Sequence, residues 1–118
     1  MTGDRQKLPD NVPFRIEALD DDRTLVTFAE FVDHRRTREL EKQLEDAIGS
    51  SRRIACDVSQ SRAIDSDWMT LLDELSIDAK KSGKRLAIVG LSEELQTSAD
   101  AIGLPNLKFV ALLEEAWR

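Results

Sequence analysis

The chain has 118 residues, of which 41% are hydrophobic and 34% are charged, and its net charge at pH 7 is −6. This length supports one domain, because two separate cores would each be too small to be stable. The acidic balance and the scattering of Lys and Arg among acidic residues argue against a nucleic-acid-binding surface, which needs clustered positive charge. No apolar run approaches the roughly 18 residues that cross a membrane, and the N-terminus lacks the apolar stretch of a secretion signal. We therefore expect a cytoplasmic protein without membrane insertion.

The chain begins with a polar segment and a predicted hairpin. We expect residues 1–12 to form a polar lead-in and residues 13–118 to form a single domain. Hydrophobic and charged residues alternate over 14–18, which is typical of a half-buried strand. The acidic residues 20–22 suit a turn, and residues 24–28 then read as the antiparallel partner strand.

After the hairpin, short apolar strands alternate with segments whose hydrophobic residues recur at helical spacing. Because parallel strands need helical crossovers between them, we expect a mostly parallel sheet with an antiparallel opening hairpin. The expected elements are a helix from Asp33 to Gly49, a strand over 53–58, a helix from Asp65 to 81, a strand over 85–89, a helix capped by Ser92 and closed by Gly103, a strand over 107–110 and a closing helical segment over 112–117.

Side chains that could carry catalysis or bind a metal are scarce. The chain has one His, one Cys and no Tyr, and its five Gly residues form no phosphate-binding loop. Cys56 lies in an apolar strand without a basic neighbour, which predicts a buried structural thiol. His34 has no second His or Cys at ligand spacing and is expected to be exposed. We therefore expect no enzymatic activity, no bound metal and no cofactor.

Residues 59–68 join a buried strand to the start of an amphipathic helix. Functional loops of α/β sheets lie at the carboxyl ends of strands, and a helix N-terminus offers free N–H groups and positive dipole charge to an anion. A phosphate on Ser66 would be tolerated there, while adding about two negative charges beside Asp65 and Asp67. The alternative is that Asp65 or Ser66 merely caps the helix.

The residues around this junction resemble the central motif of STAS domains (sulfate transporter and anti-sigma-factor antagonist). That motif has an apolar strand ending in Asp and a short loop, followed by Asp-Ser-Ser/Thr-Gly-Leu at the start of a helix. Residues 54–59 match its first part and residues 64–69 its second. Further similarities, in the family's order, lie at 83–90, 101–104 and 113–116.

The resemblance implies an α/β fold with a four- to five-stranded mixed sheet, helices packed mainly on one face, and no catalysis. Stand-alone domains of this kind resemble anti-sigma-factor antagonists, bacterial regulators of transcription. In their partner-switching circuit, a serine kinase that also holds a sigma factor binds the dephosphorylated domain and releases the sigma factor; phosphorylation of the motif serine then ends the interaction. The resemblance makes Ser66 the candidate phosphorylation site and a serine kinase/anti-sigma factor the expected partner. The expected partner-binding residues are Asp57, Ser59, Asp65, Ser66, Asp67 and Trp68.

Two motif positions depart from the family pattern and leave alternatives open. Asp67 occupies the second hydroxyl position, where it could mimic a permanent negative charge. Trp68 replaces Gly, and a side chain in the first helical turn can face either the core or a partner. The alternative function is therefore an unswitched STAS subunit of a signalling scaffold, or of a membrane transport complex on its cytoplasmic side. A small-ligand site in the loop after Asp57 is less favoured, because aromatic or Gly-rich pocket elements are not visible there.

Overall fold

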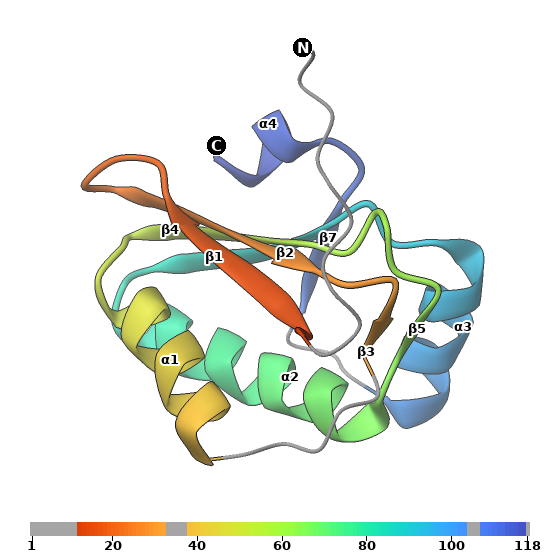
Figure 1. Ribbon diagram of the computed structural model, residues 1–118. Coiled ribbons are helices and arrows are strands. Elements are labelled where there is room, and N and C mark those ends of the chain that lie inside the picture. The colour runs from red at the N-terminus through yellow and green to blue at the C-terminus, as the bar shows by residue number, and fades with distance from the viewer. Residues whose placement is uncertain (1–11, 33–37, 104–106, 118) are drawn as a thin grey trace, which may run out of the picture.

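The computed structural model describes residues 12–32, 38–103 and 107–117, and these residues form a mixed α/β domain (Figure 1). The strands are β1 (Phe14–Ala18), β2 (Arg23–Phe28), β3 (Phe31–Val32), β4 (Arg53–Asp57), β5 (Ala63–Ile64), β6 (Arg85–Val89) and β7 (Lys108–Val110). The helices are α1 (Arg38–Gly49), α2 (Ser66–Lys81), α3 (Glu93–Ile102) and α4 (Leu113–Ala116).

The central sheet has five strands in the order β1-β2-β4-β6-β7. Strands β1 and β2 pair antiparallel, whereas β2, β4, β6 and β7 run parallel. The turn between β1 and β2 is closed by Asp20, whose Oδ1 accepts hydrogen bonds from the backbone N–H groups of Asp22 and Arg23 at 2.9 and 2.8 Å. The bond from Asp22, with that from the Arg23 side chain, holds the pKa of Asp20 below its usual value. The predicted mixed sheet with an antiparallel opening hairpin is confirmed.

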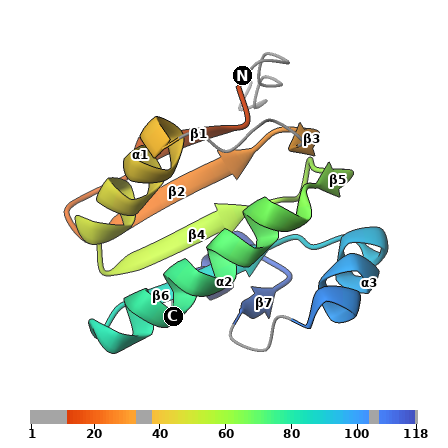
Figure 2. The ribbon, with the colours of Figure 1, turned by 90° about the horizontal axis from the view of Figure 1, so that it is seen from below.

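The main core lies between the sheet and helices α1 and α2, which both cover the same face (Figure 2). Cys56 and Ile88, from β4 and β6, are buried as predicted. Phe14 packs against Phe28 and edge-on against Trp68, with ring centroids 5.8 and 5.6 Å apart. This aromatic group ties the edge strand β1 to the first turn of α2.

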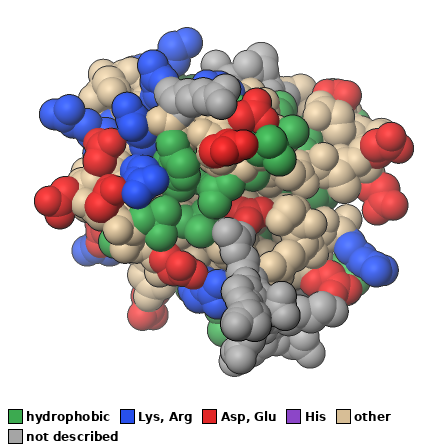
Figure 3. Space-filling view, turned by 90° about the horizontal axis from the view of Figure 1, so that it is seen from above, with side chains coloured by type: hydrophobic (Ala, Val, Ile, Leu, Met, Phe, Trp, Pro, Cys, Tyr) green, Lys and Arg blue, Asp and Glu red, His purple; other side chains and the backbone are tan. Residues whose placement is uncertain are grey.

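The opposite face of the sheet is covered by the single-turn helix α4. Leu25, Ala55 and Ala87 are buried beneath it together with Ala116. Trp117 lies half-buried beside them, and the guanidinium of Arg23 sits 5.5 Å from the centre of its ring. Figure 3 shows hydrophobic side chains gathered in the middle of this face with charged side chains around them. The helices thus lie mainly on one face, as expected, with α4 as the exception.

Two segments differ from the sequence-based expectation. Residues 31–32 and 63–64 form the parallel pair β3–β5, a small second sheet where no strand was expected. A two-residue strand is too short to display the alternating pattern by which strands are recognised. The helix expected from Asp33 to Gly49 is described from Arg38 onward; the expected cap at Asp33 and the expected exposure of His34 lie outside the described residues, so both stay predictions.

Lys84 provides a testable link between α1 and β6. Its Nζ donates a hydrogen bond to the carbonyl oxygen of Ile48 at 3.0 Å and another to that of Gly49, both at the C-terminus of α1. Because a charged donor satisfies helix-end carbonyls that lack intrahelical partners, Lys84→Met should lower the free energy of unfolding by about 1–2 kcal/mol. Urea denaturation measures this loss. Lys81→Met, at an exposed position in the last turn of α2, is the control and should change stability by less than about 0.5 kcal/mol. Equal urea midpoints for the two variants would show that the hydrogen bonds from Lys84 to the end of α1 do not stabilise the fold.

Candidate functional site

The segment that joins β4 to α2 is fixed onto the chain that follows β2. The backbone N–H of Arg62 donates to the carbonyl oxygen of Glu30 at 2.7 Å, and that of Asp65 donates to the carbonyl oxygen of Val32 at 2.6 Å. These bonds flank the β3–β5 pair, which lies beside the start of α2 at the carboxyl ends of β2 and β4 (Figure 2). The backbone that carries the candidate site is therefore hydrogen-bonded to the segment that follows β2.

Ser61 adds a buried side-chain bond to the same attachment. Ser61 is 4% exposed, and its hydroxyl donates to the carbonyl oxygen of Ala29 at 2.6 Å. Ile64, at the other end of this segment, is buried in the main core. Part of the segment between Ser59 and Ile64 is therefore packed into the domain. One side of the segment is buried, and Ser59, Arg62 and Ala63 remain exposed.

The turn after β4 is shaped by Asp57 and Gly90. Asp57 is 5% exposed, and its Oδ1 accepts a hydrogen bond from the backbone N–H of Ser59 at 2.9 Å. Gly90, which follows β6, has φ +75°, and a Cβ on it would stand 2.7 Å from the Cβ of Ser59. The Asp57 carboxylate therefore supports the turn that presents Ser59, and a contact of Asp57 with a partner stays a prediction.

The start of α2 presents Ser66 and Asp67 to solvent. Asp65 is the N-cap, and its Oδ1 accepts a hydrogen bond from the backbone N–H of Asp67 at 2.8 Å. Of the two capping candidates, Asp65 therefore fills the role, and it is half-buried. Ser66 is the first residue of the helix and is exposed, so its hydroxyl lies at the surface next to two carboxylates.

Trp68 points away from this surface. Its side chain is fully buried, because position 68 lies on the same helical stripe as Leu72 and Leu75. Trp68 therefore anchors the start of the helix to the core, and a contact of Trp68 with a partner stays a prediction. Of the expected partner-binding residues, Ser59, Ser66 and Asp67 are exposed, Asp65 is partly exposed, and Asp57 and Trp68 are buried.

One exposed aromatic residue near this segment was not predicted. Phe31 pairs with Ala63 in the β3–β5 ladder and is 52% exposed. The only hint in the sequence is a hydrophobic pair, Phe31 and Val32, that comes after the preceding strand has ended. Such a short run does not reveal which of its two side chains faces solvent.

Burial, and then the negative charge of Asp57, raise the pKa of Cys56 to about 12, so its thiol is protonated at neutral pH and shielded from solvent. Among the described residues, no group of three or more His, Cys, Asp or Glu is placed to hold a metal ion. None of the helices in this part of the chain has the length and apolar composition needed to span a membrane.

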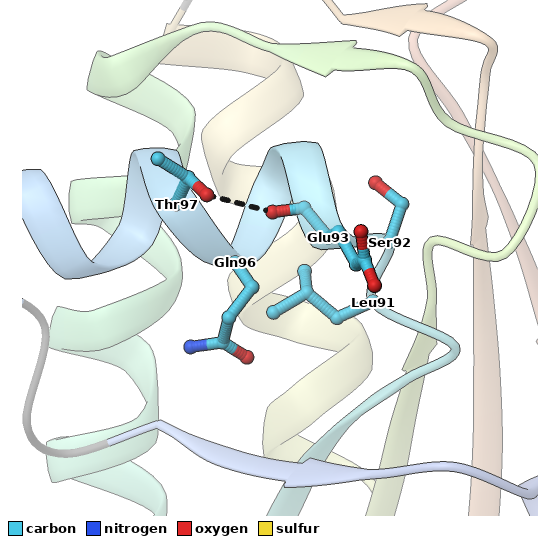
Figure 4. Close-up of a pocket in the computed structure, with 5 residues that line it drawn as sticks. All are labelled: Leu91, Ser92, Glu93, Gln96 and Thr97. Carbon is cyan, nitrogen blue, oxygen red and sulfur yellow. Dashed lines mark hydrogen bonds between the residues drawn. The ribbon is translucent and has the colours of Figure 1, made fainter.

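A hollow lies at the start of α3 (Figure 4). Leu91, Ser92, Glu93, Gln96 and Thr97 line it. The polar groups of two of them serve the helix itself: the Ser92 hydroxyl caps it by accepting from the N–H of Leu95 at 3.2 Å, and the Thr97 hydroxyl donates to the Glu93 carbonyl oxygen at 3.0 Å. Because these two hydroxyl groups already form hydrogen bonds within the helix, a small-ligand site is not favoured there.

The mixed sheet, with Asp65 and Ser66 at the start of the helix that follows its central strand, agrees with the fold that the resemblance to STAS domains implies. The chain belongs to the STAS-domain family: the family model described as "Mlab, STAS domain" matches residues 17–114. No curated protein matches the chain with significant sequence similarity.

Solved structures of similar fold include several regulators. The anti-sigma-factor antagonist SpoIIAA in its unphosphorylated form has a TM-score of 0.73 at 18% identity, over 88% of this chain and 92% of that one. A serine-to-glutamate variant of RsbS from Moorella thermoacetica has a TM-score of 0.68 at 16% identity, over 90% and 92% of the two chains. An STAS-domain protein from Planctomyces limnophilus has a TM-score of 0.71 at 12% identity, over 87% and 92%. At these identities, the likeness confirms the predicted fold.

The close approach of Gly90 to Ser59 can be tested by adding a single methyl group. Gly90→Ala would place a Cβ in contact with Ser59 and hold a non-glycine residue at positive φ, so we expect it to lower the free energy of unfolding by more than about 1 kcal/mol. It should also shift the backbone amide NMR signals of residues 59–66. Gly49→Ala is the matched control, because its Cβ would meet nothing within 4 Å; Ala in a helix should leave stability unchanged or raise it by up to about 1 kcal/mol. A Gly90→Ala protein as stable as the control would show that the two turns are not in close contact.

Proposed function

We propose that the chain is a non-catalytic protein-interaction domain of the cytoplasm, an anti-sigma-factor-antagonist-like regulator whose partner is a serine kinase/anti-sigma factor and whose binding is ended by phosphorylation of Ser66. The observation that carries the proposal is the position of Ser66, exposed at the first residue of α2 while Asp65 performs the capping. The structural likeness to SpoIIAA in both its unphosphorylated and its phosphorylated form supports a switch of this kind.

The physical effect of a phosphate at Ser66 follows from its surroundings. The N-terminus of the 16-residue helix α2 offers positive dipole charge to an anion, and an exposed side chain can be modified without disturbing the core. The phosphate would nevertheless add about two negative charges beside Asp65 and Asp67. Any partner surface that covers these groups would have to desolvate them, which is costly for unpaired charges. Phosphorylation thus opposes association while the fold is kept.

In this proposal, the chemistry of the switch belongs to the partner. The kinase supplies ATP and its metal ion, and this chain supplies the acceptor hydroxyl and the surface around it. The buried Cys56 thiol takes no part, since its raised pKa and its burial leave it without nucleophilic character.

A second candidate function is supported by Asp67, which is exposed one position after Ser66. A permanent carboxylate there could hold the domain in a single binding state. The chain would then be an unswitched STAS subunit of a signalling scaffold, or of a membrane transport complex on its cytoplasmic side. The two candidates share one surface and differ in whether Ser66 or Asp67 controls it.

Three substitutions separate these candidates, with the co-purified partner from native cells as the binding probe. If Ser66 is the switch, Ser66→Ala should abolish phosphate incorporation by the cognate kinase with little effect on folding, because the cap is Asp65. Ser66→Asp should weaken partner binding roughly tenfold or more through added charge at the interface. If Asp67 sets the binding state, Asp67→Ser should change affinity instead, and both Ser66 variants should bind like the parent.

Affinity measurements by calorimetry, with urea denaturation of each variant, distinguish these outcomes. The control is Glu114→Ser, which removes an exposed charge from α4 across the sheet and should leave binding unchanged. The proposed surface is wrong if all three site variants bind normally while Glu114→Ser breaks the complex.

A further inference from the structure

We propose that Phe31 is the apolar anchor that holds the partner next to Ser66, and that this partner presents an apolar pocket bordered by a carboxylate. The inference rests on the proposed function, because it assumes that a protein binds over the start of α2. It adds a contact residue from a different part of the chain and specifies the chemistry that the partner must offer.

The exposure of Phe31 follows from its place in the β3–β5 ladder. The two register pairs of this ladder face opposite ways: Val32 and Ile64 are buried, whereas Phe31 and Ala63 are exposed. Because Ala63 carries only a methyl group, it covers little of Phe31, its partner in the ladder, which is 52% exposed. A large aromatic side chain in this position gains free energy when a partner covers it.

The backbone beneath the ring is fixed on both sides. The carbonyl oxygen of Glu30 accepts from the N–H of Arg62, and that of Val32 accepts from the N–H of Asp65. Phe31 lies between these two acceptors, and Asp65 directly precedes Ser66. The same hydrogen-bonded pair therefore places β3, which carries Phe31, and the start of α2, which carries Ser66, at one end of the molecule (Figure 2). A preorganised anchor costs little ordering entropy on binding.

Arg62 supplies the charge that defines the border of the partner's pocket. Its side chain is 75% exposed, and its Nε lies 3.7 Å from Oε1 of Glu30. An ion pair of this length and exposure contributes little to stability, so the guanidinium can exchange Glu30 for a carboxylate on a partner. Arg and large aromatic residues are the types that dominate binding energy in protein interfaces. A phosphate on Ser66 would repel such a carboxylate, which agrees with the direction of the proposed switch.

Leu112 offers a matched control for exposed apolar area. It is 56% exposed, close to Phe31, but it directly precedes α4 on the opposite side of the sheet. If substitution of Phe31 weakens binding and substitution of Leu112 does not, the loss reflects the position of Phe31 and not the removal of exposed apolar area in general.

The first experiment places a photo-cross-linking phenylalanine analogue at position 31, 59 or 112 of the full chain in its native cells. We expect positions 31 and 59 to capture the same protein and position 112 not to capture it. Capture of only a second copy of this chain at position 31, or of a protein different from that at position 59, would overturn the inference.

The second experiment measures the affinity of the protein captured at position 59, produced separately, for purified variants. Phe31→Ala should weaken binding at least tenfold, Arg62→Gln should weaken it several-fold and reduce its salt dependence, and Leu112→Ala should change it less than twofold. Circular dichroism and urea denaturation check that each variant is folded. If Phe31→Ala binds within twofold of the parent, the anchor is refuted while the proposed function stands. If position 59 captures nothing, the proposed function fails, and the inference fails with it.

Discussion

The attachment of the β4–α2 segment to the residues that follow β2 is the constraint on which the rest of the site depends. A long connection at the carboxyl end of a sheet would ordinarily be mobile, because its backbone groups bond to water. Here the N–H groups of Arg62 and Asp65 bond to carbonyl oxygens of Glu30 and Val32, and the buried hydroxyl of Ser61 reaches back to Ala29. The attachment fixes where α2 begins and therefore where Ser66 lies.

The family motif divides into a buried half and an exposed half with different roles. Asp57 closes the turn after β4, and Trp68 fixes the first turn of α2 against Phe14. Ser66 and Asp67 face solvent between these two supports. Because the supports lie in the core, a charge change at the exposed positions can alter binding without a large loss of stability. This separation is what a reversible switch on a folded domain requires.

Much of the fold could be predicted because the hydrophobic patterns of the main elements are long enough to read. The alternation in β1 and the apolar runs of β4 and β6 predict the sheet, and the helical stripe of α2 predicts the position of Ser66 at its start. The β3–β5 pair could not be predicted, because each strand has two residues and the pairing joins segments about thirty positions apart. Because this pairing could not be predicted, the exposure of Phe31 could not be predicted either. The orientation of Trp68 was also undetermined from the sequence, since a first-turn residue can face either way until the packing around Phe14 is known.

Native-state hydrogen exchange of the backbone amide of Asp65 tests the preorganised surface most directly. If the β4–α2 segment is fixed as described, this amide, bonded to the carbonyl oxygen of Val32 at 2.6 Å, should exchange with an opening free energy within about 1 kcal/mol of that of the β4 amides, near the value for global unfolding. Exchange near the rate of an unstructured peptide, while the β4 amides stay protected, would show that the segment opens independently and would contradict a preformed binding surface.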